Sequence, residues 1–119
     1  MKVLICGDRH WNNYSSILNI VQRLKKAYGN IKIVQGGCSG ADIIAKKAAI
    51  ECGLEYAEYP ANWSKYGKRA GPLRNQQMLD EENPDMVIAF HPNINQSKGS
   101  RDMITRAKQV GIQTYIFDK

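Results

Sequence analysis

Apolar residues along the chain fall into two patterns that alternate from one end to the other. Five short runs are apolar with little polar interruption, which is typical of strands buried on both faces of a sheet. These runs span residues 2–6, 31–35, 54–59, 86–90 and 112–117. Between them, apolar residues recur at helical spacing and predict helices. The predicted helices span about 14–28, 41–52, 71–82 and 100–110.

This alternation of strands and helices predicts an α/β fold. We expect a single Rossmann-like domain with a mostly parallel five-stranded sheet flanked by helices. Crossovers in such sheets are right-handed, and ligands bind beyond the carboxyl ends of the strands. The loops expected to carry a ligand are 7–13, 36–42, 60–75 and 91–101. Residues 61–70 are predicted to be irregular, and Ser100 is expected to cap the last helix.

The composition fits one folded domain spanning residues 1–119. Hydrophobic residues make up 43% of the chain, and no stretch reaches the roughly 20 apolar residues of a membrane span. The first apolar run is too short for a signal peptide. The cysteines are three in number and form no CxxC motif, so we expect them to be reduced thiols. We therefore expect a cytoplasmic protein with no membrane partner. The net charge of +6 suggests an anionic partner, although basic charge also serves solubility alone.

The strongest local signal is Gly36-Gly37-Cys38-Ser39-Gly40-Ala41-Asp42, which follows a predicted strand and opens a helix. Glycines let backbone N–H groups approach an anion closely, and the amino end of a helix adds partial positive charge. The motif matches neither a GxGxxG sequence nor a Walker loop. We interpret it as a ligand loop, with a plain strand-to-helix turn as the alternative. Asp42 is expected to cap the helix or to hold a ligand hydroxyl.

Two further loops have a similar character. Lys98-Gly99-Ser100-Arg101 follows the fourth strand. Its helix start can hold a phosphate that the two cations neutralise, or it is an ordinary capped helix. Gly7-Asp8-Arg9-His10-Trp11 leaves the first strand. There Arg9 is placed to meet a phosphate, and Trp11 can stack on a base or cover the end of the sheet.

Residues 62–75 interleave aromatic and basic side chains, beginning with Trp63. This composition suits single-stranded nucleic acid, in which bases stack and cations follow the backbone, and it suits a mononucleotide equally. Asn75 shares a helical face with apolar residues, so we expect it to point at a polar group such as a ligand. Four arginines are expected to converge on an anion: Arg9, Arg69, Arg74 and Arg101.

Metal and nucleophile chemistry have little support in the sequence. His10 and His91 lack the spacing of a metal motif, and no HExxH sequence is present. Cys38 lies in the glycine-rich loop, but no general base is close to it along the chain. We therefore expect no metal, no cofactor and no catalytic nucleophile.

Seven segments of the chain, taken in order, form a recognisable set. They are Cys-Gly-Asp-Arg-x-Trp (6–11), Gly-Gly-Cys-Ser-Gly-Ala-Asp (36–42), Pro-Ala-x-Trp (60–63), Tyr-Gly-Lys-x-Ala-Gly (66–71), Arg-Asn-x-x-Met (74–78), Val-Ile-Ala-Phe (87–90) and Gly-Ser-Arg-Asp-Met (99–103). They resemble the YspA-like, cpYpsA-related branch of the SLOG superfamily, whose small proteins are frequent in bacteria and phages. The resemblance implies one SLOG-like domain with a Rossmann-like fold and a nucleotide-derived ligand.

The superfamily contains both enzymes and sensors. LOG phosphoribohydrolases cut the N-glycosidic bond of nucleoside monophosphates, and sensor domains bind NAD-derived or other nucleotide signals in defence systems. The enzymes have a segment resembling Pro-Gly-Gly-x-Gly-Thr-x-x-Glu. Here only Gly99-Ser100 remains, Met103 stands at the glutamate position, and Asp102 is the nearest carboxylate.

The resemblance therefore favours a non-catalytic binder of an ADP-ribose-like or cyclic nucleotide signal. In a phage, such a protein would sequester a signal of the host's defence system. The alternatives are a nucleotide N-glycosidase and a single-stranded nucleic-acid binder. The expected partner is a nucleotide-derived small molecule rather than nucleic acid, and a homo-oligomer is expected. The catalytic candidate is Asp102. Predicted ligand-binding residues are Gly7, Asp8, Arg9, Trp11, Gly36, Gly37, Cys38, Ser39, Gly40, Asp42, Trp63, Arg69, Arg74, Asn75, Phe90, Lys98, Gly99, Ser100 and Arg101.

Overall fold

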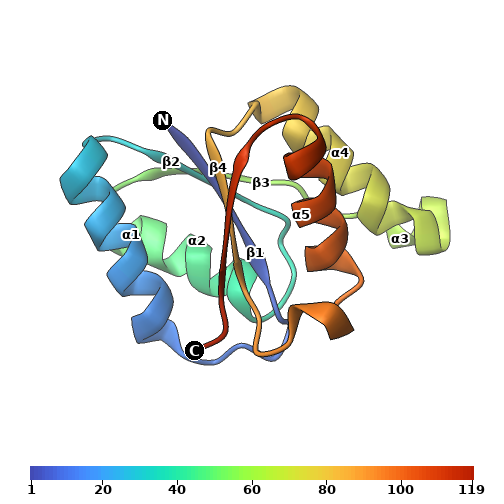
Figure 1. The fold of residues 1–119 in the computed structure, drawn as a ribbon, viewed down its shortest axis with the longest axis horizontal. Coiled ribbons are helices and arrows are strands. Elements are labelled where there is room, and N and C mark those ends of the chain that lie inside the picture. Colours follow the sequence, from blue (N-terminus) through green and yellow to red (C-terminus); the bar gives the residue numbers. More distant parts are fainter.

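The centre of the fold is a five-stranded parallel sheet with helices on both faces (Figure 1). The computed structural model describes residues 1–119. The strands are β1 (Lys2–Gly7), β2 (Lys32–Gln35), β3 (Glu55–Glu58), β4 (Met86–Phe90) and β5 (Gln113–Phe117). The helices are α1 (Tyr14–Tyr28), α2 (Ala41–Glu51), α3 (Trp63–Tyr66), α4 (Ala70–Glu82) and α5 (Gly99–Gln109), with the 3-10 turns η1 (Gly67–Arg69) and η2 (Ile94–Gln96). None of the helices is long and apolar enough to cross a membrane.

The strand order β3-β2-β1-β4-β5 places β1 at the centre of the sheet. The chain first extends the sheet on one side of β1 and then crosses over to add β4 and β5 on the other side. Gly7 pairs with Phe90 where β1 and β4 end, at the point where the order changes direction. Such a switch point leaves room for a ligand between the loops. The predicted α/β fold with a parallel five-stranded sheet is confirmed.

Each face of the sheet carries its own apolar core, because the side chains of a strand alternate between the two faces. Val3 and Ile5 of β1 pack with Ile17 of α1 in the core that α1 and α2 cover. Leu4 of β1 packs with Met78 of α4 in the core that α4 and α5 cover. All five side chains are almost completely buried. The two pairs of helices are therefore fixed relative to the central strand (Figure 1).

Two local predictions are wrong. The segment 61–70 is not irregular throughout, because residues 63–69 form α3 and η1 and Ala70 begins α4. Asn62 Oδ1 accepts the Lys65 N–H at 3.1 Å and starts α3, which ends at Gly67 with a positive φ of 57°. The strands β3 and β5 are not buried on both faces, because they are the two edges of the sheet and expose most of their side chains.

Two glycines allow close packing at this end of the sheet: Gly7 lets the end of β1 approach β4, and Gly40 lets the loop after β2 approach the loop after β1. A Cβ atom on Gly7 would lie 2.2 Å from the Phe90 carbonyl oxygen, and one on Gly40 would lie 2.2 Å from the Asp8 carbonyl oxygen. Gly40 also has a φ of 74°, in the left-handed region. The Asp8 carbonyl accepts the Ala41 N–H at 3.1 Å, which fixes the start of α2 beside the end of β1.

Gly40→Ala is expected to destabilise the protein more than Gly53→Ala. Both glycines have positive φ, 74° and 66°, so each alanine incurs a backbone cost, which is roughly 1–2 kcal/mol. A Cβ at position 53 meets nothing within 4 Å, whereas at position 40 it collides with backbone atoms. That collision adds roughly 1–3 kcal/mol. Urea unfolding measures the difference, and equal free energies of unfolding for the two variants would contradict this packing.

Candidate functional site

A cavity of about 620 Å³ lies beyond the carboxyl ends of β1 and β4. Its walls come from the loop after β1, the glycine-rich loop after β2, the first turns of α4 and the start of α5. This is the switch point of the sheet, and the volume is within the usual range for small-molecule sites. The predicted residues that line it are Gly7, Asp8, Arg9, Cys38, Asp42, Trp63, Arg74, Asn75, Lys98, Gly99, Ser100 and Asp102.

A second hollow, of about 580 Å³, adjoins the first. We call the first hollow the main compartment and the second the side compartment. Three residues line both of them: Arg9, Cys38 and Trp63. The side compartment adds three further predicted residues, Gly36, Gly37 and Ser39.

Five predicted residues lie outside both compartments. Trp11 is only 9% exposed and packs edge-to-face on the fully buried Phe90, with ring centroids 5.6 Å apart, so both rings belong to the core. Gly40 is packed against the Asp8 and Arg9 backbone. Arg69 lies exposed in η1, and Arg101 donates to the Asn95 carbonyl at 3.2 Å. The four arginines therefore do not converge on one point.

The main compartment is also lined by residues that the sequence interpretation missed. Lys68 lies in the aromatic and basic segment, and His91 directly follows β4. Both could therefore have been predicted to line the site from their positions in the sequence. His10 and Ser97 complete the polar wall. The prediction that Ser100 caps the last helix is wrong. Helix α5 starts at Gly99, and Ser97 Oγ accepts the Ser100 N–H at 3.0 Å. The signal in the sequence for this earlier helix start was Ser97, a good capping residue, two positions before Gly99.

The glycine-rich loop uses most of its own N–H groups within the protein. Asp42 Oδ2 accepts the N–H of Gly36 at 3.1 Å and that of Cys38 at 3.2 Å. The Gly37 N–H donates to Gln35 Oε1. The first three N–H groups of the loop are therefore not free to bind a phosphate. Asp42 does not cap its own helix; it holds the loop in shape and also lines the main compartment.

The carboxyl group of Asp42 is only 6% exposed. This burial is the largest influence on it and raises its pKa to about 6, although the Cys38 N–H and the Arg74 charge favour the ionised form. Burial also raises the pKa of the Cys6 thiol to about 12, so this thiol stays protonated and unreactive. No cluster of three or more His, Cys, Asp or Glu side chains is placed to hold a metal ion.

Arg74, predicted to meet a ligand phosphate, is engaged within the protein and only 9% exposed. Its Nη1 donates to the carbonyl oxygen of Gly36 at 2.6 Å and to that of Tyr59 at 3.3 Å. Its Nε donates to Asn75 Oδ1 at 3.1 Å, and the sulfur of Cys38 is 3.9 Å from Nη2. A side chain on Gly36 would collide with the guanidinium, which explains the glycine there. Arg74 thus ties the ends of β2 and β3 to α4.

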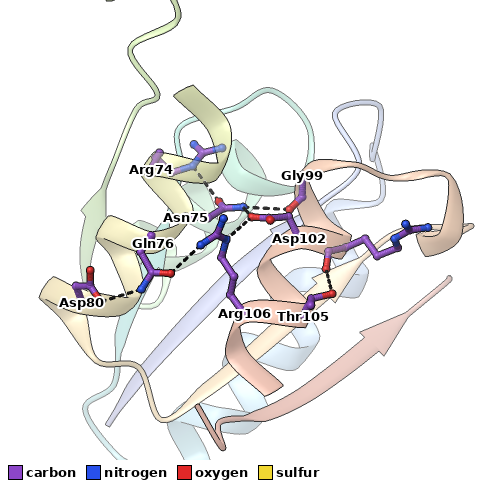
Figure 2. Close-up of polar contacts among 9 residues, drawn as sticks. Arg74, Asn75, Gln76, Asp80, Gly99, Asp102, Thr105 and Arg106 are labelled. Atoms are coloured by element: carbon purple, nitrogen blue, oxygen red, sulfur yellow. Dashed lines mark hydrogen bonds and ion pairs between the residues drawn. The ribbon is translucent and has the colours of Figure 1, made fainter. Parts of the chain in front are cut away.

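Asn75 continues this connection to α5, as Figure 2 shows. Its Nδ2 donates to the Gly99 carbonyl at 3.1 Å and to Asp102 Oδ2 at 3.0 Å. Arg106 Nε donates to the same carboxylate oxygen at 2.8 Å, and its Nη1 donates to Gln76 at 2.8 Å. The polar group that Asn75 was expected to face is therefore the first turn of α5. Asp102 lines the main compartment with its charge paired to Arg106.

Comparison with known proteins agrees with this architecture. The model of the YspA, cpYpsA-related SLOG family matches residues 1–66, and the chain belongs to this family. The Gene 61 protein of Mycobacterium phage D29 is 30% identical over 122 residues, which cover 98% of this chain and 95% of the phage protein. The DNA processing protein A (DprA) of Streptococcus pneumoniae has a similar fold, with a TM-score of 0.51 and 19% identity. That similarity covers 98% of this chain and 59% of the DprA chain.

Asp42 is expected to make stability fall as the pH rises from about 4 to about 6. Its pKa is about 6 in the folded protein against an ordinary value of 3.8. In that window the unfolded chain ionises first, so the folded state loses about 3 kcal/mol of relative stability. Asp42→Asn should remove this slope, and Asp118→Asn, an exposed control, should keep it. Urea unfolding at several pH values measures the slopes; the same slope in Asp42→Asn would exclude Asp42 as its source.

Arg74→Lys is expected to lower the free energy of unfolding by about 2–3 kcal/mol, because an ammonium group cannot reproduce the forked contacts and leaves buried acceptors unpaired. The matched control is Arg101→Lys, which changes an exposed arginine with one backbone contact and should cost less than about 0.5 kcal/mol. Thermal and urea unfolding compare the two. If the two variants are equally stable, Arg74 does not connect the loops as described.

Proposed function

We propose that the main compartment binds a nucleotide-derived small molecule through its phosphate, an ADP-ribose-like or cyclic nucleotide signal. The observation that carries the proposal is the set of cations without acidic partners around the cavity. Arg9, Lys68 and Lys98 line it, and none of them forms an ion pair. Its carboxylates Asp8, Asp42 and Asp102 offset them only partly, because Asp102 is paired with Arg106 and Asp42 lies close to the Arg74 charge. An anionic ligand is therefore favoured.

The start of α5 supplies a place for the phosphate. The N–H group of Gly99, which lines the cavity, makes no hydrogen bond within the protein, whereas those of Ser100 and Asp102 are satisfied by Ser97 and Lys98. A helix of 11 residues adds partial positive charge at this end. Lys98 lies beside this free donor, so charge and hydrogen bonding act at the same place.

Binding without turnover is the form of this function that the site supports best. Cleavage of an N-glycosidic bond needs a carboxylate whose charge stabilises developing positive charge. Asp102 is the candidate, but Asn75 and Arg106 both donate hydrogen bonds to its Oδ2 atom. A similar protein in a phage is compatible with sequestration of a host signal.

Lys98→Ala and Lys68→Ala are each expected to weaken nucleotide binding about tenfold or more, the effect of losing one charge-assisted contact. Lys47→Ala, an exposed lysine of α2 outside both compartments, is the matched control and should bind like wild type. Titration calorimetry with AMP, cyclic AMP, ADP-ribose and NAD gives the affinities. Wild-type affinity in both cavity variants would place the site elsewhere.

The same samples distinguish binding from hydrolysis. Intact nucleotide recovered after heat denaturation and chromatography supports sequestration. Free base that accumulates over many turnovers, and is lost in Asp102→Asn, would instead establish an N-glycosidase. Tighter binding of a single-stranded oligonucleotide than of any nucleotide in the panel would favour the nucleic-acid alternative.

A further inference from the structure

The two compartments meet at a pair of side chains from distant parts of the chain. The Arg9 guanidinium carbon lies 5.9 Å from the centroid of the Trp63 ring, within range of a cation–π contact. Because both residues line both hollows, the pair stands at the boundary between them. Trp63 is also 45% exposed, whereas tryptophan is highly buried on average.

The chemistry differs on the two sides of this boundary. Two lysines of the main compartment, Lys68 and Lys98, are absent from the side compartment, which has no carboxylate either. The wall of the side compartment consists of glycine backbone, Ser39, Pro60 and Ala61 in addition to the boundary residues. Such a wall suits an uncharged ring or a sugar, whereas the main compartment suits phosphate.

The position of Trp63 is set by few contacts. The helix α3 that carries it buries no residue. A Cβ on Gly71 would lie 3.2 Å from the edge of the indole, so the glycine leaves room for the ring at this place. The ring therefore lies between α4 and Arg9 with a large part of its surface open to a ligand.

We propose that the ligand is a two-part molecule that occupies both compartments: a nucleotide whose phosphates carry a second sugar or base. Arg9 contacts the phosphates between the two halves, and Trp63 contacts the half in the side compartment. This inference rests on the proposed function, since it assigns the class of ligand to the same site. It makes Trp63 a specificity-determining residue that distinguishes two-part ligands from mononucleotides.

The test compares ligands that share one half. ADP-ribose and NAD are expected to bind at least tenfold more tightly than ADP. Trp63→Ala should weaken ADP-ribose and NAD binding about tenfold, the size of one lost stacking contact, and should change ADP binding less than twofold. Trp63→Phe should restore most of the loss, because it keeps an aromatic ring. Tyr66→Ala removes another exposed aromatic of α3 that lines neither compartment and should bind all three ligands like wild type.

A spectroscopic readout locates the second half directly. The chain has two tryptophans, and Trp11 is buried in the core, so Trp11→Phe leaves Trp63 as the single reporter. Its fluorescence should change with saturating ADP-ribose or NAD and stay constant with ADP. Equal affinity for ADP and the two-part ligands, with equal effects of Trp63→Ala on all, would overturn this inference and leave the proposed function standing. Absence of binding by every nucleotide would overturn both.

Discussion

The buried guanidinium of Arg74 is the interaction on which the ligand end of the molecule depends. A permanently charged group that is almost inaccessible to water must find its acceptors inside the protein. It finds them in the carbonyl groups of Gly36 and Tyr59 and the amide of Asn75, which belong to three different segments. The ends of β2 and β3 and the first turns of α4 are therefore held at fixed positions around one side chain. Through Asn75 the same constraint reaches the start of α5 (Figure 2).

One result is that the glycine-rich loop is a preformed wall. Its N–H groups are directed inward to Asp42 and Gln35, so the loop keeps its shape without a ligand. The free cations of the cavity lie instead in the loop after β1, in η1 and at the start of α5, where the Gly99 N–H is also free. The site thus separates two tasks that a phosphate-binding loop usually combines: one set of residues gives rigidity, and another remains available for an anion.

The sequence was sufficient for the sheet and the main helices, because apolar runs and helical periodicity report burial directly. It also indicated the loops that surround the cavity, since the carboxyl ends of parallel strands share one edge. It did not reveal the direction of individual side chains beyond the strand ends. Trp11 turns into the core because Phe90 and the neighbouring helix cover it, and Asn75 faces α5 because Gly99 and Asp102 are there. Such contacts join residues far apart in the chain, and local pattern does not encode them.

The pairing of β1 with β4 has a consequence for the order of assembly. Lys2 of the first strand donates its N–H to Asp85, 83 positions later, and Gly7, which lines the cavity, pairs with the buried Phe90. Pairings this distant in sequence require closure of a long loop, which has an entropic cost and slows folding. During synthesis, β1 has only β2 as a neighbour until most of the chain has left the ribosome. The cavity is therefore complete only after β4 and the start of α5 have been made, and a chain truncated before β4 lacks the pairing at the base of the site.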